Sequence, residues 1–235
     1  MNDQVKSRQR VADHGEVFTA EREVKAMCDL VAQECDRIDS RFLEPACGDG
    51  NFLAEVLSRK LAAVTARYKK SPFDWERNAI LALSSIYGVD ILQDNCEDCR
   101  SRLFALWDKE YTKVCKDEAH EDTRRAAKII LEGNIVCGNA LSLMCVDARQ
   151  QDTDKPIIFP EWTFPNNDAF TKRRDFRFDV LLKENDDSDN YGQFSLFAED
   201  AMGLDNWDVD PETKELIPKP VREYAPVHYR RLTDD

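Results

Sequence analysis

The sequence lacks any apolar run that approaches the roughly 20 residues needed to cross a bilayer. Its first ten residues are polar and contain no apolar stretch of the kind found in signal peptides. The chain also has no excess of basic residues. It contains 33 Lys and Arg and 46 Asp and Glu, which gives a net charge of −13. Proteins that bind nucleic acid by themselves normally carry a basic surface. We therefore expect a cytoplasmic protein with no strong nucleic-acid footprint.

Ligand sets for metals and frameworks of disulfides are missing as well. The three histidines have no ligand spacing, and Cys96 and Cys99 have the spacing of a zinc site without a second pair nearby. The eight cysteines are irregularly spaced in a chain of 235 residues that shows no export signal. This pattern predicts reduced, mostly buried thiols and no metal site.

What the sequence does contain is an alternation of strand-like and helix-like segments. Apolar residues at helical spacing predict an amphipathic helix over Glu21–Asp36, with Thr19 as its N-cap. Strands that alternate with helices indicate a parallel sheet with right-handed crossovers, so we expect an α/β fold. The further helices are expected over 51–68, 75–85, 93–107, 117–131 and 140–145, and the strands over 41–45, 85–91, 134–137 and 176–182.

The most informative segment is Phe42–Leu53, which reads FLEPACGDGNFL. An apolar strand end runs into a Gly-x-Gly turn, and an apolar, helix-forming run follows. Gly48 and Gly50 let the backbone turn sharply and approach a ligand closely. The amino terminus of the following helix offers unpaired N–H groups and a positive dipole end to a carboxylate.

This segment closely resembles the Asp-Pro-Ala-Cys-Gly-Ser-Gly-x-Phe-Leu motif of adenine-specific (N6) DNA methyltransferases from restriction-modification systems. Glu44 stands here for the usual Asp, and Asp49 stands for the usual Ser. The resemblance implies a Rossmann-like class I S-adenosylmethionine-dependent methyltransferase fold, a parallel sheet with flanking helices. It also implies that this turn cradles the methionine part of S-adenosylmethionine.

Three further segments lie where the resemblance expects them. His14–Ala20 is similar to the family's Gly-x-x-Phe/Tyr-Thr-Pro element, with Ala20 in place of Pro. Gly88–Ile91 resembles the second motif, whose acid accepts ribose hydroxyls, and Ile135–Leu141 resembles the Gly-Asp/Asn-Ala-Leu motif, whose polar side chain contacts the adenine amino group. The cofactor-binding residues that the resemblance implies are Phe18, Thr19, Glu44, Pro45, Ala46, Cys47, Gly48, Gly50, Phe52, Asp90, Ile91, Asn139 and Ala140.

Purely structural interpretations of the same residues stay open. Asp90 can be a turn residue at a strand end, and Asn139 can be a helix N-cap, a role compatible with ligand contact. Asp90 follows the glycine turn by about twice the roughly 20 residues found in dinucleotide-binding folds. This spacing argues against a nicotinamide cofactor.

The family's catalytic loop is missing. In the family, Asn/Asp-Pro-Pro-Tyr/Phe follows the fourth strand, accepts the hydrogens of the adenine amine and stacks on the flipped base. The expected strand Phe178–Leu182 is followed here by Lys183–Asp186, in which Asn185 is the nearest positional match, and no Pro-Pro-aromatic sequence occurs anywhere. No catalytic residue is assigned. The chain resembles short "subunit M"-type proteins, which implies a second methyltransferase or restriction subunit that carries the catalytic loop and target recognition and makes the DNA contacts.

The amino-acid composition of the chain changes after residue 182. We expect a methyltransferase-like cofactor-binding domain over 1–182 and an acidic, aromatic-containing C-terminal tail over 183–235. The tail contains an acidic run and scattered aromatic residues, and it is expected to lack a core of its own. Two interpretations compete: a floppy terminus, or an arm that wraps its own body or a partner.

Three functions fit these observations. The first is a methyltransferase subunit that binds S-adenosylmethionine and acts only with a partner. The second is a catalytically inactive methyltransferase-like scaffold or regulator in a defence locus. The third is a small-molecule or protein methyltransferase with an unusual loop. Cofactor binding separates the first and third from a scaffold that has lost the pocket.

Overall fold

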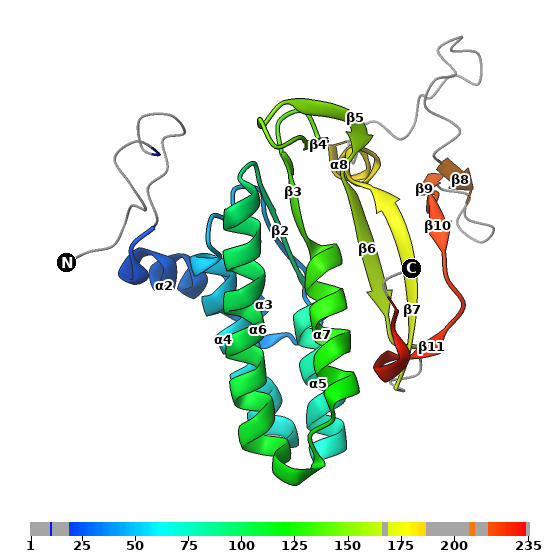
Figure 1. The fold of residues 1–235 in the computed structure, drawn as a ribbon. Helices are drawn as coiled ribbons and strands as arrows, with labels where there is room; N and C mark the ends of the chain where they lie inside the picture. Colours follow the sequence, from blue (N-terminus) through cyan, green and yellow to red (C-terminus); the bar gives the residue numbers. More distant parts are fainter. Residues whose placement is uncertain (1–9, 11–18, 166–168, 187–206, 210–215, 234–235) are drawn as a thin grey trace.

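The computed structural model describes residues 10, 19–165, 169–186, 207–209 and 216–233, so Phe18 lies outside the described residues (Figure 1). The helices are α2 (Glu21–Leu30), α3 (Ala32–Asp36), α4 (Asn51–Tyr68), α5 (Pro72–Ser84), α6 (Gln93–Cys115), α7 (Glu121–Asn134) and α8 (Phe178–Asp186), with short 3-10 helices η1 (Lys116–Glu118) and η4 (Tyr229–Arg231). The strands are β1 (Phe42–Glu44), β2 (Ile86–Asp90), β3 (Ile135–Asn139), β4 (Met144–Val146), β5 (Asp152–Pro156), β6 (Ile158–Thr163), β7 (Phe170–Arg177), β8 (Trp207–Val209), β9 (Leu216–Pro218), β10 (Arg222–Glu223) and β11 (Val227–His228).

A five-stranded sheet in the order β1-β2-β3-β4-β5 forms the centre of the fold. The first three strands are parallel, and β4 and β5 add to β3 as antiparallel strands. The parallel strands are joined by helix pairs, α4 with α5 and α6 with α7. The predicted α/β class with a parallel sheet is therefore confirmed for these strands.

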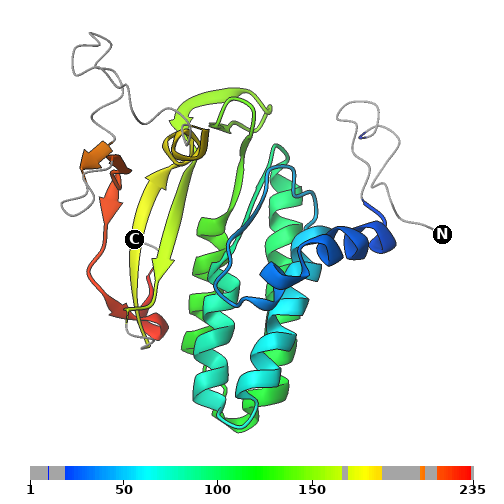
Figure 2. The same ribbon diagram turned by 180° about the vertical axis from the view of Figure 1, so that it is seen from behind.

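The four long helices α4 to α7 lie side by side and pack against β2 and β3, as both views show (Figures 1 and 2). Large fully buried side chains such as Trp75, Trp107 and Leu53 fill the space between them. Helix α5 begins after the Ser71-Pro72 break, where the Ser71 hydroxyl accepts a hydrogen bond from the Asp74 amide. These helices form the main core of the molecule.

A second sheet covers the other face of β2. Strand β7 pairs in antiparallel fashion with β6, and it also pairs with β10 and β11. Tyr87 and Val89 of β2 form a smaller core with Ile157, Phe159 and Phe178. The Tyr87 hydroxyl donates a hydrogen bond of 2.9 Å to the Pro160 carbonyl, which fixes β6 across this face.

Two predicted elements are wrong. The helix predicted over 140–145 is a turn followed by β4, and the turn contains Leu143 in the left-handed region (φ 62°), whose amide bonds to the Asn139 carbonyl. The strand predicted over 176–182 ends at Arg177 in β7, and α8 begins at Phe178. The Arg177 guanidinium binds the Asp179 carboxylate in the first turn of α8, and an acid in that position favours a helix start.

The helix predicted over Glu21–Asp36 is split, and its cap differs from the prediction. Val31 leaves helical geometry (φ −120°, ψ 31°) and separates α2 from α3. Ala20, not Thr19, is the N-cap residue, and no side chain caps the helix. Within the described residues, no helix is both long and apolar enough to cross a membrane.

The end of the chain packs against the helices. Tyr229 is fully buried, and its hydroxyl hydrogen-bonds Glu76 on α5. The same carboxylate accepts hydrogen bonds from the Tyr111 hydroxyl and from Arg230 at 2.8 Å. Leu232 is also buried in the main core. The last part of the proposed tail thus lies along the body, whereas residues 187–206 are outside the described part of the chain.

Candidate functional site

A cleft of about 530 Å³ lies at the carboxyl ends of the three parallel strands. Ligands in open α/β sheets bind at this edge, because loops and helix amino termini meet there. Eleven of the thirteen residues implied by the resemblance line the cleft: Thr19, Glu44, Pro45, Ala46, Cys47, Gly48, Phe52, Asp90, Ile91, Asn139 and Ala140. Their role toward a ligand stays a prediction.

The glycine turn forms one wall of the cleft. Gly48 and Gly50 both have positive φ, 53° and 85°, a region that other residues rarely adopt. Gly50 lies behind the wall, where an added Cβ would come within 2.7 Å of the Cys99 sulfur. Gly50 is the N-cap of α4 and provides no side-chain cap, so amide groups of the first turn keep their capacity to bind an anion.

Asp90 joins the glycine turn to the second strand. Its carboxylate accepts hydrogen bonds from the Gly48 amide at 2.9 Å, the Leu92 amide at 2.8 Å and the Asn95 side chain at 3.2 Å. These donors fix the carboxylate at the cleft and use most of its acceptor capacity. Asp90 therefore stabilises the turn. This structural role holds whether or not Asp90 also contacts a ligand.

Glu44 lies at the end of β1 and lines the cleft. Its Oε2 atom is buried and has no hydrogen-bond partner among the described residues. Burial, together with the nearby carboxylates of Asp90 and Asp49, raises the pKa of Glu44 to about 7. A ligand that brings a hydrogen-bond donor or a positive charge to this oxygen would relieve that cost.

The cysteines around the cleft are free thiols. Cys47 hydrogen-bonds Cys99, and this bond together with burial raises the pKa of its thiol. Burial likewise raises the pKa of Cys96, which lies beside Cys137. All eight cysteines are unpaired in the structure and six are buried, so the prediction of mostly buried cysteines is confirmed. Protonated, buried thiols pack and do not act as nucleophiles.

Asn139 ends β3 at the opposite wall. Its side-chain oxygen accepts the Leu141 amide at 3.0 Å, and its amide donates to Asp152 at 3.0 Å. The oxygen thus stabilises the turn, much as in the capping interpretation, although no helix follows. Leu141 is 96% exposed at the rim of the cleft.

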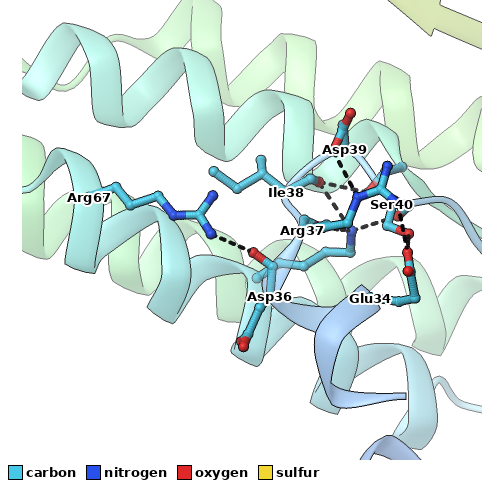
Figure 3. A network of polar contacts seen from close by, with 9 residues as sticks. Glu34, Asp36, Arg37, Ile38, Asp39, Ser40 and Arg67 are labelled. Carbon is cyan, nitrogen blue, oxygen red and sulfur yellow. Dashed lines mark hydrogen bonds and ion pairs between the residues drawn. The ribbon is translucent and has the colours of Figure 1, made fainter.

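A buried lysine holds the loop that leads into β1. The Lys60 ammonium on α4 is fully buried and donates to three carbonyls, those of Arg37, Ile38 and Ser40, at 2.8, 3.1 and 2.6 Å. Figure 3 shows this loop, with Glu34 turned toward Arg37 and Ser40. Burial lowers the pKa of Lys60 to about 8. This bonding fixes the start of β1 and hence the position of the glycine turn.

Sequence reasoning missed six residues of the cleft: Asp49, Asn51, Leu92, Asn95, Gly138 and Leu141. Asp49 and Asn51 flank the second glycine, and Arg102 on α6 binds both side chains. Each missed residue lies next to a predicted one or one helical turn away. The motifs therefore located the cleft, although they did not include these neighbouring residues.

The chain is similar to a larger protein that acts on DNA. It is 27% identical over 104 residues to the DNA methyltransferase A of Bacillus subtilis (strain 168). The match covers 43% of this chain, and it spans 12% of that protein's length. No family model matches the chain, and no solved structure matches it. The match supports a methyltransferase-like relationship.

Proposed function

We propose that this chain is the S-adenosylmethionine-binding part of an adenine-specific (N6) DNA methyltransferase of the restriction-modification type, with a Rossmann-like class I fold. The supporting observation is the cleft itself. It collects four segments, around Thr19, Glu44–Gly48, Asp90 and Asn139, that are far apart in the sequence and in the order of the family's motifs. The match to a DNA methyltransferase supports the same reaction class.

The charges of the cleft suit this cofactor. S-adenosylmethionine carries a sulfonium and an ammonium group, and its carboxylate is the kind of anion that a helix amino terminus binds. Three carboxylates, Glu44, Asp49 and Asp90, line the cleft, and the uncapped start of α4 lies beside them. A dinucleotide would instead place its pyrophosphate near these acids. Glu44 would hold a positively charged group, and the α4 amides would hold the carboxylate.

The methyl transfer needs groups that the described residues do not supply. The segment expected to end in the catalytic loop is helix α8, and Asn185 lies in that helix. We propose that a second methyltransferase or restriction subunit provides the amine acceptors and the target recognition. Under this proposal the isolated chain binds the cofactor without methylating DNA.

Calorimetric titration with S-adenosylmethionine tests the cofactor site. Saturable binding to the wild-type chain is expected, and Gly48→Val should abolish it, because a branched side chain at φ 53° strains the turn and fills the ligand's path. Ala62→Val places the same side chain on the exposed face of α4, outside the cleft lining, and should keep binding. Circular dichroism checks that each variant is folded. No binding at millimolar cofactor by the folded wild type would refute the proposal.

Transfer of tritium from labelled cofactor to DNA tests the need for a partner. The purified chain alone should incorporate no label. Robust incorporation would show that the chain holds a complete catalytic loop, and the split-enzyme proposal would fail.

The alternative is an inactive methyltransferase-like scaffold or regulator in a defence locus. The missing Pro-Pro-aromatic sequence favours this alternative as much as it favours a split enzyme. The two differ in the cleft, because a scaffold has no need to bind the cofactor. Absence of binding in the titration would select the scaffold.

A further inference from the structure

Two segments of this acidic chain carry more basic than acidic residues. Residues 170–177 and 216–232 contain eight Lys or Arg and two acidic residues, a net charge of +6. The whole chain carries −13, which leaves −19 for everything else. The first of these segments forms β7, and the second runs from β9 through η4. Pairing of β7 with β10 and β11 brings the two basic segments into one sheet.

This sheet lies at the side of the molecule away from α2, with β10 beyond β7, as both views show (Figures 1 and 2). Five of the eight cations have carboxylate partners. Lys172 binds Glu223, Arg173 binds Asp175, Arg174 binds Glu161, Arg177 binds Asp179 and Arg230 binds Glu76. Lys219, Arg222 and Arg231 are exposed, and none has an ion-pair partner within the described residues.

Arg231 lines a small cavity, and Arg222 stacks on the tyrosine beside that cavity. The Arg222 guanidinium lies 4.5 Å from the centre of the Tyr224 ring, and Arg173 lies 4.6 Å from it. The Tyr224 hydroxyl donates to Asp175 at 3.2 Å, which fixes the ring. A cavity of about 190 Å³ opens beside the ring, with Thr171, Arg173 and Arg231 among its lining residues. Arg222 is thus positioned by stacking while its N–H groups stay available.

We propose that this basic sheet, with Arg222 and Arg231 as its main contacts, binds the phosphate backbone of DNA. Planar guanidinium groups bind phosphate through two parallel hydrogen bonds, which suits Arg222, stacked on Tyr224 in β10, and the exposed Arg231 in η4. The choice of DNA as the polyanion rests on the proposed function. The presence of exposed basic residues on this sheet does not depend on that function.

The acidic remainder of the chain does not prevent this contact. Exposed charges farther away than about 8 Å are largely screened at physiological ionic strength. The interaction should therefore be weak and should depend steeply on salt. Three free cations predict a slope of about −3 for the logarithm of affinity against the logarithm of salt concentration.

Fluorescence anisotropy with a labelled DNA duplex tests the proposal on the full chain without cofactor. The double variant Arg222→Gln/Arg231→Gln should lose about tenfold in affinity at about 50 mM salt, and its salt slope should fall by about two. The control Lys69→Gln/Lys70→Gln removes the same charge from exposed lysines at the end of α4 and should bind like the wild type.

Three outcomes overturn the proposal: no DNA binding by the wild type, equal loss in both double variants, or competition by polyglutamate as strong as that by unlabelled DNA. The last outcome would assign the surface to an acidic protein. Titration of the arginine variant with S-adenosylmethionine should match the wild type, because the cleft is lined by other residues. If neither the wild type nor any variant binds S-adenosylmethionine, the cofactor proposal fails. The DNA measurement still tests the basic sheet in that case.

Discussion

The region from β1 to β3 and the region from β6 to η4 are organised in opposite ways. In the first, β1 and β2 are each followed by helices that pack on the sheet, and the strands pair in chain order. In the second, β7 pairs with β10 and β11, which lie about fifty residues further along the chain. The first region carries the acidic cleft, and the second carries the basic sheet. The comparison shows that local patterns specify one region and distant contacts specify the other.

The largest test of this comparison removes a distant contact. Tyr229→Ala should lower the free energy of unfolding by about 3–5 kcal/mol, because a fully buried ring is lost and the Glu76 carboxylate loses a donor. Urea denaturation measures the change. Tyr229→Phe removes the hydroxyl alone and should cost about 1–2 kcal/mol. A loss below about 1 kcal/mol for the alanine variant would mean that the end of the chain is a separable arm.

A second test concerns a contact within the first region. Lys60→Met should lower the free energy of unfolding by about 3 kcal/mol, because three buried carbonyls lose their donor. Lys69→Met on the exposed end of the same helix is the control and should change little. The same denaturation experiment serves both variants. Equal stability of Lys60→Met and the wild type would show that the loop before β1 needs no anchor.

The smallest expected effect concerns Glu44. Its pKa is raised from 4.5 to about 7 in the folded protein, so the folded state binds the proton more tightly than the unfolded state does. The resulting stabilisation is present below pH 4.5 and is lost as the pH rises through 7. Glu44→Gln should remove this dependence and should be about 1–2 kcal/mol more stable than the wild type near pH 8.

Unfolding measured between pH 4 and pH 8 checks this prediction. Glu97→Gln, on the exposed side of α6, is the matched control. If the free energy of unfolding depends on pH in the same way for the wild type and Glu44→Gln, burial does not destabilise the ionised Glu44 carboxylate. The cleft would then lack the unsatisfied oxygen on which the cofactor proposal partly rests.

The sequence predicted the first region well for a physical reason. Its strands are short apolar runs, its helices show apolar periodicity, and Gly48 and Ser71-Pro72 mark the turns. These signals are local. The motifs also placed eleven cofactor-site candidates around one cleft, because parallel strands bring their carboxyl ends together.

The errors have physical causes too. Phe178–Leu182 is apolar enough for either a strand or a helix, and its partners decide: the Phe178 amide bonds to Ile157, and the ring packs against Phe159. The N-cap predicted at Thr19 is wrong, because α2 begins at Glu21 and its N-cap is Ala20, which has no side chain that could cap the helix. No local pattern reveals that Tyr229 fills the space beside Glu76, since the two residues are far apart in the sequence.

The buried carboxylate of Glu76 makes the stability of the helices depend on a distant segment of the chain. Tyr111 is available to it as soon as α6 has formed, but Tyr229 and Arg230 lie 153 and 154 residues further along the sequence than Glu76. A fragment that ends before residue 229 keeps a negative charge between its helices with two of its three partners missing. Such a fragment would open more readily and be degraded sooner, so the helices reach a stable state only when the segment around Tyr229 is present.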